Sequence, residues 1–199
     1  MFPPLVRRVL AFVGLGLGLV MALVSAAKRR HEPLPVLGQV PTFHLVDAHG
    51  QPFTDASMRG HPSVVDFFFT RCLSSCPRLT ARMAQLQGDV ARRAPSVKLV
   101  SISVDPENDT PEVLADYAAR NNADRARWSF VTGPLDDVER AVIQGFKMSG
   151  TKVYKNAKDY DVIHGDWFVL VDASGNIRAY CPTGTAKEYG EMLAKVERL

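Results

Sequence analysis

Two cysteines, Cys72 and Cys76, stand four positions apart where an apolar run ends and a helical pattern begins. A spacing of i, i+4 brings two thiols to neighbouring positions on a helix face, close enough for a disulfide bond or for both sulfurs to bind one ion. A helix N-terminus and the neighbouring cation of Arg71 would stabilise the thiolate form, which binds soft metal ions and attacks disulfides. Two buried structural cysteines are the alternative. The position between a strand and a helix favours a functional pair.

The third cysteine, Cys181, falls in a predicted hairpin strand. We expect it to be a small, buried apolar residue, and a role as resolving thiol for a disulfide of the first two cysteines stays open. Four histidines lie at strand or turn edges without ligand-like spacing, and we expect them to be solvated: His31, His44, His49 and His61.

Acidic residues offer a second kind of chemistry. Asp66 is the one charge in the apolar run 64–70. We expect it to be buried, and two interpretations stay open: a paired structural carboxylate, or a carboxyl with a raised pKa near the cysteines. Asp105, Glu107 and Asp109 have the composition of a hard-metal loop, but Pro106 and the helix start that follows favour turn and capping roles.

Hydrophobic periodicity predicts the elements that must position these residues. Strands are expected at 42–46, 51–54, 64–70, 97–104, 128–132, 167–171 and 177–181, helices at 77–94, 110–120, 134–146 and from 186 to the end, and a loop at 147–161. Alternating strands and helices closed by a hairpin predict an α/β domain, a mixed sheet flanked by helices. We place this domain at residues 38–199, after an extended, proline-rich linker at 31–37.

The first 30 residues form a separate unit. Val9 to Ala27 is a stretch of nineteen residues without a charge, and as a helix it would span roughly 28 Å, close to the thickness of the hydrocarbon core of a bilayer. The stretch is longer than the apolar core of most signal peptides, so we favour an N-terminal transmembrane anchor. A signal peptide cleaved near Ser25-Ala26-Ala27 is the alternative. Both interpretations export the rest of the chain.

The charge distribution follows the same division. The whole chain of 199 residues has a net charge of +3, but five of its 24 basic residues and none of its 21 acidic residues lie within positions 7–30. Residues 31–199 therefore carry 19 basic against 21 acidic residues, a net charge of −2. They contain no basic run, which disfavours nucleic-acid binding. Three cysteines are too few for a disulfide scaffold.

Three segments together resemble the SCO/SenC family of membrane-anchored, thioredoxin-like proteins. The segment 68–77, FFTRCLSSCP, is similar to the family's copper-site motif, and 101–112, SISVDPENDTPE, to its second motif. His164, with the strand at 167–171 and the turn at 172–176, resembles the third. The match runs in order through nearly all of residues 36–199.

The resemblance implies a copper chaperone for cytochrome c oxidase assembly. It implies that Cys72, Cys76 and His164 bind Cu(I), with Cu(II) as a further oxidation state, and that the ion passes to the dinuclear copper site of oxidase subunit II. Two thiolates and an imidazole form a soft ligand set that suits Cu(I). The implied setting is a bacterial inner membrane crossed once, with the domain in the periplasm. An upstream thiol reductant or copper donor is the further partner, because oxidised cysteines cannot bind the ion.

The chain departs from the family pattern beside the cysteines. Arg71 stands where the family usually has His, and Leu73 and Ser74 replace Pro-Asp, which puts the selection of redox partners in question more than copper binding. An enzyme that uses the same cysteine pair, a thiol–disulfide oxidoreductase or a thiol peroxidase, is the rival hypothesis. A redox or copper sensor is a third.

Overall fold

Strand β4 (Ser63–Phe68) is the most buried strand of the sheet, with all six residues buried. The structure, a computed structural model, describes residues 21, 33–73, 75–148 and 167–199. In this part of the chain, eight strands form one sheet in the order β1-β8-β7-β4-β5-β6-β2-β3. Strand β4 pairs in parallel with β5 on one side and antiparallel with β7 on the other, so the sheet is mixed, as predicted.

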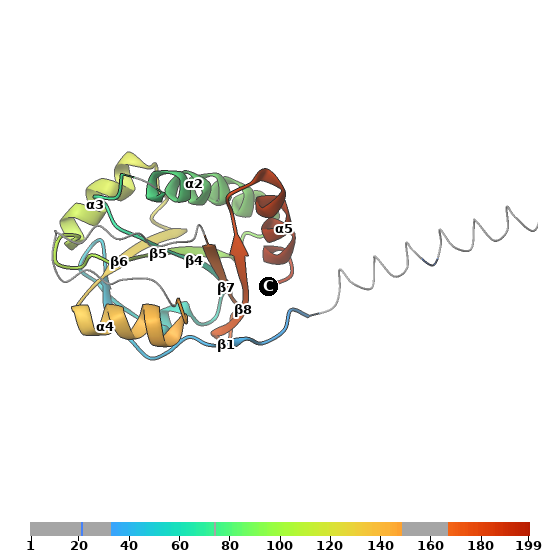
Figure 1. The fold of residues 1–199 in the computed structure, drawn as a ribbon, viewed down its shortest axis with the longest axis horizontal. Helices are drawn as coiled ribbons and strands as arrows, with labels where there is room; N and C mark the ends of the chain where they lie inside the picture. Colours follow the sequence, from blue (N-terminus) through green and yellow to red (C-terminus); the bar gives the residue numbers. More distant parts are fainter. Residues whose placement is uncertain (1–20, 22–32, 74, 149–166) are drawn as a thin grey trace, which may run out of the picture. The chain divides into compact units, whose positions relative to one another are not determined.

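Most of the remaining elements lie close to their predicted positions. The other strands are β1 (Gly38–Gln39), β2 (His44–Asp47), β3 (Pro52–Thr54), β5 (Lys98–Ser103), β6 (Trp128–Thr132), β7 (Trp167–Val171) and β8 (Asn176–Pro182). The helices are η1 (Asp55–Met58), α2 (Cys76–Arg93), α3 (Pro111–Arg120), α4 (Leu135–Glu139), η2 (Arg140–Gly145) and α5 (Ala186–Val196). Figure 1 shows α2, α3 and α5 on one face of the sheet and α4 on the other.

Three features differ from the sequence prediction, of which the short helix η1 is the simplest, since no element was predicted at 55–58. Strand β1, which the pattern did not predict, pairs antiparallel with β8, with Gly38 opposite Ile177. The expected single helix at 134–146 is an α-helix followed by a π-helical stretch, in which the N–H of Phe146 donates to the carbonyl of Ala141 at 2.9 Å. This wider turn places the buried Phe146 ring against Phe67 of β4, with 5.3 Å between the ring centres.

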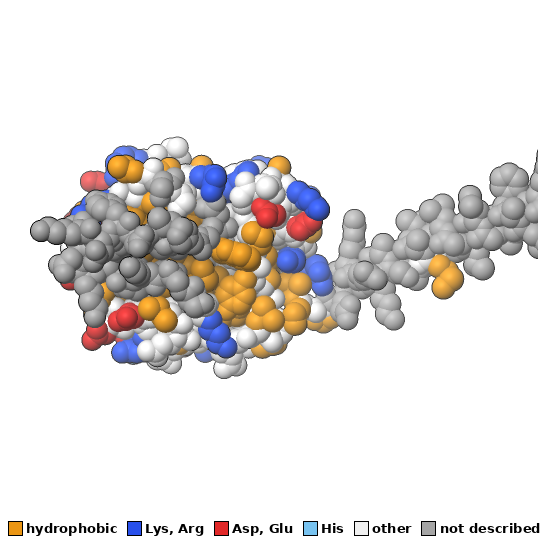
Figure 2. Space-filling view, in the orientation of Figure 1, with side chains coloured by type: hydrophobic (Ala, Val, Ile, Leu, Met, Phe, Trp, Pro, Cys, Tyr) orange, Lys and Arg blue, Asp and Glu red, His pale blue; other side chains and the backbone are white. Residues whose placement is uncertain are grey.

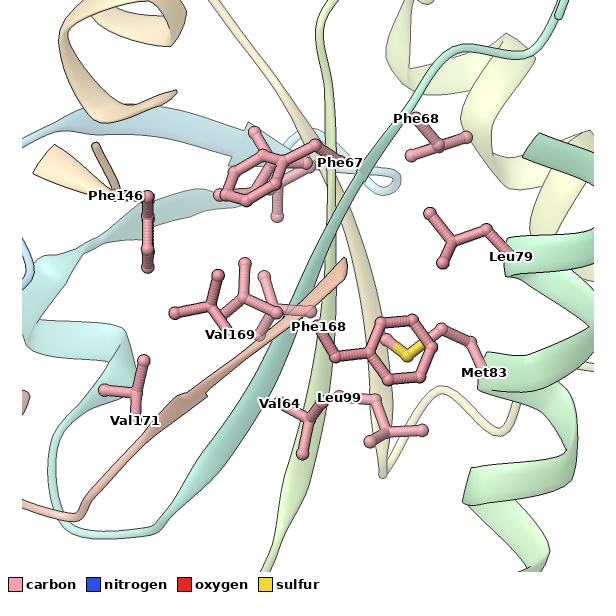
Figure 3. Close-up of a cluster of buried hydrophobic side chains, with 14 of the residues drawn as sticks. Val64, Phe67, Phe68, Leu79, Met83, Leu99, Phe146, Phe168, Val169 and Val171 are labelled. Carbon is pink, nitrogen blue, oxygen red and sulfur yellow. The ribbon is translucent and has the colours of Figure 1, made fainter. Parts of the chain in front are cut away.

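The side chains of β4 alternate between the two faces of the sheet and fill a core on each (Figure 3). Phe67 points toward Phe146, while Phe68 points toward Leu79 of α2. Asp66 therefore lies on the α2 face, because its position along the strand has the same parity as that of Phe68. The carboxyl end of β4 leads directly into the cysteine segment, so both packed faces support that segment.

The π-helical stretch makes a close backbone approach that yields a prediction. A Cβ atom added at Gly145 would lie 1.9 Å from Cγ of Pro41, so Gly145→Ala forces the two segments apart. We expect this substitution to lower the free energy of unfolding by about 1–3 kcal/mol. In Gly190→Ala, the matched control in α5, the added Cβ meets nothing within 4 Å, and the gain in helix propensity should stabilise by about 0.5–1 kcal/mol. Urea titrations of both variants measure the difference, and equal effects would contradict the prediction.

The molecular surface gathers apolar side chains over the region of β1, β7 and β8, bordered by charged side chains of both signs (Figure 2). The large apolar residues exposed in this part of the chain are Val36, Leu37 and Trp167. Among the described residues, no helix combines the length and the apolarity needed to cross a bilayer. Apart from Met21, the predicted anchor at 1–30 lies outside the described residues, and so do Ser74 and His164.

Candidate functional site

The two cysteines meet where β4 gives way to α2. Cys76 is the first residue of α2, and its backbone N–H donates to Sγ of Cys72 at 3.4 Å. Both residues carry reduced thiols and are buried, with Cys72 7% and Cys76 3% exposed. The structure thus brings the predicted pair together, but not on one helix face, and that expectation was wrong. Pro77 has no N–H to donate to a preceding turn, so the helix starts at Cys76 and Cys72 stays in the loop.

The two sulfurs sit in different environments. Burial is the main cause that raises the pKa of the Cys76 thiol far above its ordinary value, and the hydrogen bond with Cys72 and the charges of Cys72 and Asp66 add to it. The Cys72 sulfur instead faces the N-terminus of α2, where the first backbone N–H groups have no partner within the helix and favour negative charge. Cys72 is therefore the sulfur better placed to carry a charge, and Cys76 the one that keeps its proton.

Arg71, the cation that the sequence places beside the cysteines, forms an ion pair with a buried carboxylate. Its guanidinium binds the carboxylate of Asp105 through Nη2 at 2.6 Å and through Nε at 3.1 Å. Asp105 is 1% exposed, so this ion pair lies at the edge of the interior. Asp105 therefore compensates part of the positive charge of Arg71, and the contribution of this cation to a thiolate stays a prediction.

Of the two interpretations of Asp66, the structure supports the second, a buried carboxyl with a raised pKa near the cysteines. The side chain is 1% exposed, and its one described side-chain partner is the Ser101 hydroxyl, which donates to Oδ1 at 2.5 Å. Ser101 in turn accepts the indole N–H of Trp128 at 2.8 Å. Burial raises the pKa of Asp66 to about 7, although the Ser101 hydrogen bond opposes the shift. Since the charge of Asp66 also raises the pKa of Cys76, the carboxyl lies within electrostatic reach of the cysteine pair.

Tyr117 is a neighbour of the site that the sequence did not reveal. Its hydroxyl lies 2.9 Å from the Thr80 hydroxyl on α2, and its ring packs 5.2 Å from that of Phe68. Burial raises the pKa of Tyr117, and the charges of Cys76, Asp66 and Cys72 contribute to the shift. The sequence pattern at 110–120 predicted a helix and gave no sign that Tyr117 lies near the cysteines. The electrostatic effect of the cysteines on Tyr117 depends on how α3 packs against the sheet, which the sequence does not specify.

The remaining candidates are not part of the described cysteine site. Cys181 is 1% exposed in β8, as expected, and Lys195 Nζ lies 3.9 Å from its sulfur. His44 and His49 are exposed, as predicted, whereas His61 is half-buried and lies 3.4 Å from the Ser63 hydroxyl. His31 falls outside the described residues.

Two thiols are the ligands that the described residues offer to a metal ion at this site. No group of three or more His, Cys, Asp or Glu side chains suited to a metal occurs within the described part of the chain. Sulfur ligands select soft ions such as Cu(I). The donor set of Cys72 and Cys76 fits copper, and the third predicted ligand, His164, lies outside the described residues.

A mixed sheet covered by helices, with a buried cysteine pair between a central strand and a helix N-terminus, defines a thioredoxin-like dithiol protein. The family model SCO1/SenC matches residues 36–199, and the chain belongs to this family. That match covers the sheet, its helices and all three segments on which the resemblance rested.

Individual relatives support the same assignment. The chain is 32% identical over 165 residues to the SCO1 protein homolog of Bacillus subtilis, covering 82% of this chain and 84% of the relative. It superposes with a TM-score of 0.71 and 28% identity on BsSco, described as a member of the Sco family of cytochrome c oxidase assembly proteins, over 84% of this chain and 97% of that one. Copper-bound ScoI of Bradyrhizobium japonicum matches with a TM-score of 0.66 and 25% identity, over 81% and 99%.

Proposed function

We propose that this protein is a membrane-tethered copper chaperone that binds Cu(I) through Cys72, Cys76 and His164. It delivers the ion to the dinuclear copper site of cytochrome c oxidase subunit II. The observation that carries the proposal is the cysteine pair itself: two reduced thiols brought together at a helix N-terminus, in a family with a copper-bound member. The apolar stretch 9–27 supports the tether, and as part of this proposal the following domain is exported to the periplasm of a bacterium.

The site suits an ion that is carried rather than kept. Leu73, between the two cysteines, is 95% exposed, so the loop that joins the ligands faces solvent. A partner can therefore approach the ion from the loop side and replace the three ligands one at a time. Three ligands leave one side of the ion open to such an exchange. Cys76 must lose its proton when the ion binds, so binding releases protons to solvent.

Thiol–disulfide exchange is the second candidate function, and the asymmetry of the pair favours it. Cys72 has the helix N-terminus to stabilise its charge, and Cys76 is the more buried thiol. A pair of this kind can attack a disulfide with the first sulfur and resolve the mixed disulfide with the second. The step oxidises the two cysteines to a disulfide and reduces the partner disulfide to two thiols. The same pair would thus be redox-active when it holds no copper.

An anaerobic Cu(I) titration of the reduced full-length chain tests the proposed function. We expect wild type to bind one ion per chain tightly and His164→Ala to bind it roughly tenfold or more weakly, about 1.4 kcal/mol, because one of three ligands is lost. His49→Ala is the matched control, since His49 is an exposed turn residue of the same type and should leave the affinity unchanged.

The outcomes separate the two functions. If copper binding were weak and the same in wild type and His164→Ala, and disulfide exchange were rapid, the copper-chaperone hypothesis would be wrong. The oxidoreductase hypothesis would then be favoured. Tight binding that depends on His164 would support the chaperone. Delivery is then measured directly, as the rate at which the loaded chain passes copper to a soluble copper-binding domain of oxidase subunit II.

A further inference from the structure

Two carboxylates on the loop between β5 and α3 are buried although they belong to a charged residue type. Asp105 is 1% and Asp109 0% exposed. Buried carboxylates require hydrogen-bonding or charged partners, because an isolated charge in the interior is costly. Their partners lie 34 and 39 positions earlier in the sequence, in the two residues directly before Cys72. These contacts connect the second family-like segment to the cysteine segment.

Asp109 holds Thr70 by both its backbone and its side chain. The Thr70 N–H donates to Oδ2 of Asp109 at 3.1 Å, and the Thr70 hydroxyl donates to Oδ1 at 2.5 Å. The Ser103 hydroxyl, at the end of β5, donates to Oδ2 at 2.5 Å. Three donors thus engage both carboxylate oxygens. Burial raises the pKa of Asp109, and the hydrogen bonds from Ser103 and Thr70 oppose this shift because they stabilise the charged form.

Asp105 holds the next residue in the same way. Its Oδ2 accepts both N–H groups of Arg71, and its Oδ1 accepts the Asn108 amide at 2.8 Å. The backbone N–H of Asp105 donates to the Ser103 hydroxyl at 3.1 Å. Since that hydroxyl also donates to Asp109, the two carboxylates belong to one continuous network. We refer to Thr70, Arg71, Ser103, Asp105 and Asp109 as the carboxylate network.

We propose that Asp105 and Asp109 are positioning residues that hold the segment before Cys72 and thereby fix its sulfur against the N-terminus of α2. Cys76 is already fixed as part of that helix, so the sulfur–sulfur geometry depends on where Cys72 is held. Leu73 contributes little packing on the other side, because its side chain is 95% exposed. The network thus holds the two residues directly before Cys72, and the Cys72 N–H in turn donates to the carbonyl of Phe69 at 3.2 Å. The expected effect on copper affinity rests on the proposed function. The expected effect on the reduction potential of the cysteine pair does not.

Sulfur geometry matters for both chemistries. A disulfide needs its Cβ atoms about 3.8 Å apart, and deviations store strain and make the bond easier to reduce. A bound ion likewise requires ligands that the surrounding structure holds in place, and loss of such support typically costs about 10–100-fold in affinity. Loosening the network should therefore change the reduction potential of the cysteine pair and weaken copper binding together.

Asp109→Asn in the full-length chain tests the proposal. The amide keeps the size of the side chain but presents N–H groups to the donors of Thr70 and Ser103. We expect the equilibrium constant of the dithiol with glutathione to change about tenfold, a shift of about 30 mV, and Cu(I) affinity to fall about tenfold. Glu107→Gln is the matched control: Glu107 lies on the same loop but is exposed, so its loss of charge should leave both quantities unchanged.

Thr70→Val and Thr70→Ser keep the proposal testable if Asp109→Asn does not fold. Valine has nearly the shape of threonine but lacks the hydroxyl that donates to Asp109, and serine retains this hydroxyl. We expect the potential to shift in Thr70→Val and to stay at the wild-type value in Thr70→Ser. A folded Asp109→Asn, or a folded Thr70→Val, with wild-type potential would overturn the proposal. If wild type itself binds no copper, the proposed function fails, and the potential still decides the positioning role.

Discussion

Replacing Cys76 with serine should weaken Cu(I) binding by the reduced chain roughly a hundredfold or more, about 2.7 kcal/mol. The hydroxyl of serine is a hard ligand that does not ionise near neutral pH, whereas copper in this oxidation state prefers thiolate sulfur. Cys72→Ser should have an effect of the same order. Its loss also removes the sulfur that accepts the Cys76 N–H at 3.4 Å. Competition with a chromophoric Cu(I) chelator measures the Cu(I) affinities of wild type, Cys76→Ser and Cys72→Ser.

Cys181→Ser is the control that separates this site from cysteine content in general. Cys181 is buried in β8, where Lys195 Nζ lies 3.9 Å from its sulfur and can donate to a serine hydroxyl instead. We expect unchanged copper affinity in this variant. If Cys181→Ser weakened binding as much as Cys76→Ser, the assignment of the ligands to Cys72 and Cys76 would be wrong.

The fold was predictable from the sequence wherever one pattern determined one element. The apolar run at 64–70 became the buried β4, and the predicted N-cap Thr110 accepts the N–H of Val113 at 3.4 Å. Strand β1 was not predictable, because its two residues gain their structure from pairing with β8, some 140 positions later. The π-helical stretch was missed for a related reason. Its wider turn is set by the packing of Phe146 on Phe67, which periodicity does not encode.

The sequence predicted which residues belong to the site better than it predicted their hydrogen-bond partners. The chemistry of thiols identified Cys72 and Cys76, and the lone charge in an apolar strand identified Asp66. The partners of Arg71 could not be predicted, since Asp105 lies 34 positions away and reaches it only because β4 and β5 pair in parallel. Asp109 was interpreted as a turn residue for the same reason. Its carboxylate in fact holds Thr70, beside the cysteines.

Asp66 provides the second large prediction, a stability that falls as the pH rises. Its pKa is about 7 in the folded chain against 3.8 as the reference value. Below pH 4 the carboxyl is protonated in both the folded and the unfolded state, so it does not change the balance. Between these values the folded state keeps a proton that the unfolded state releases, so the free energy of unfolding decreases with rising pH. Above pH 7 the loss is complete, and three pKa units correspond to about 4 kcal/mol.

Asp66→Asn should remove this dependence. The asparagine Oδ1 can still accept the Ser101 hydroxyl, and the amide has no charge to bury. Urea unfolding of the reduced, metal-free chain at several pH values gives the difference in stability between wild type and variant, in which all other titrating groups cancel. We expect this difference to grow by up to about 4 kcal/mol in favour of the variant from pH 4 to pH 8. Ser101→Ala should instead extend the loss of stability to higher pH and enlarge it, because the lost hydrogen bond stabilised the charged form of Asp66. A difference that does not vary with pH would show that Asp66 titrates alike in the folded and unfolded chain. The burial of this carboxyl beside Cys76 would then have no electrostatic consequence.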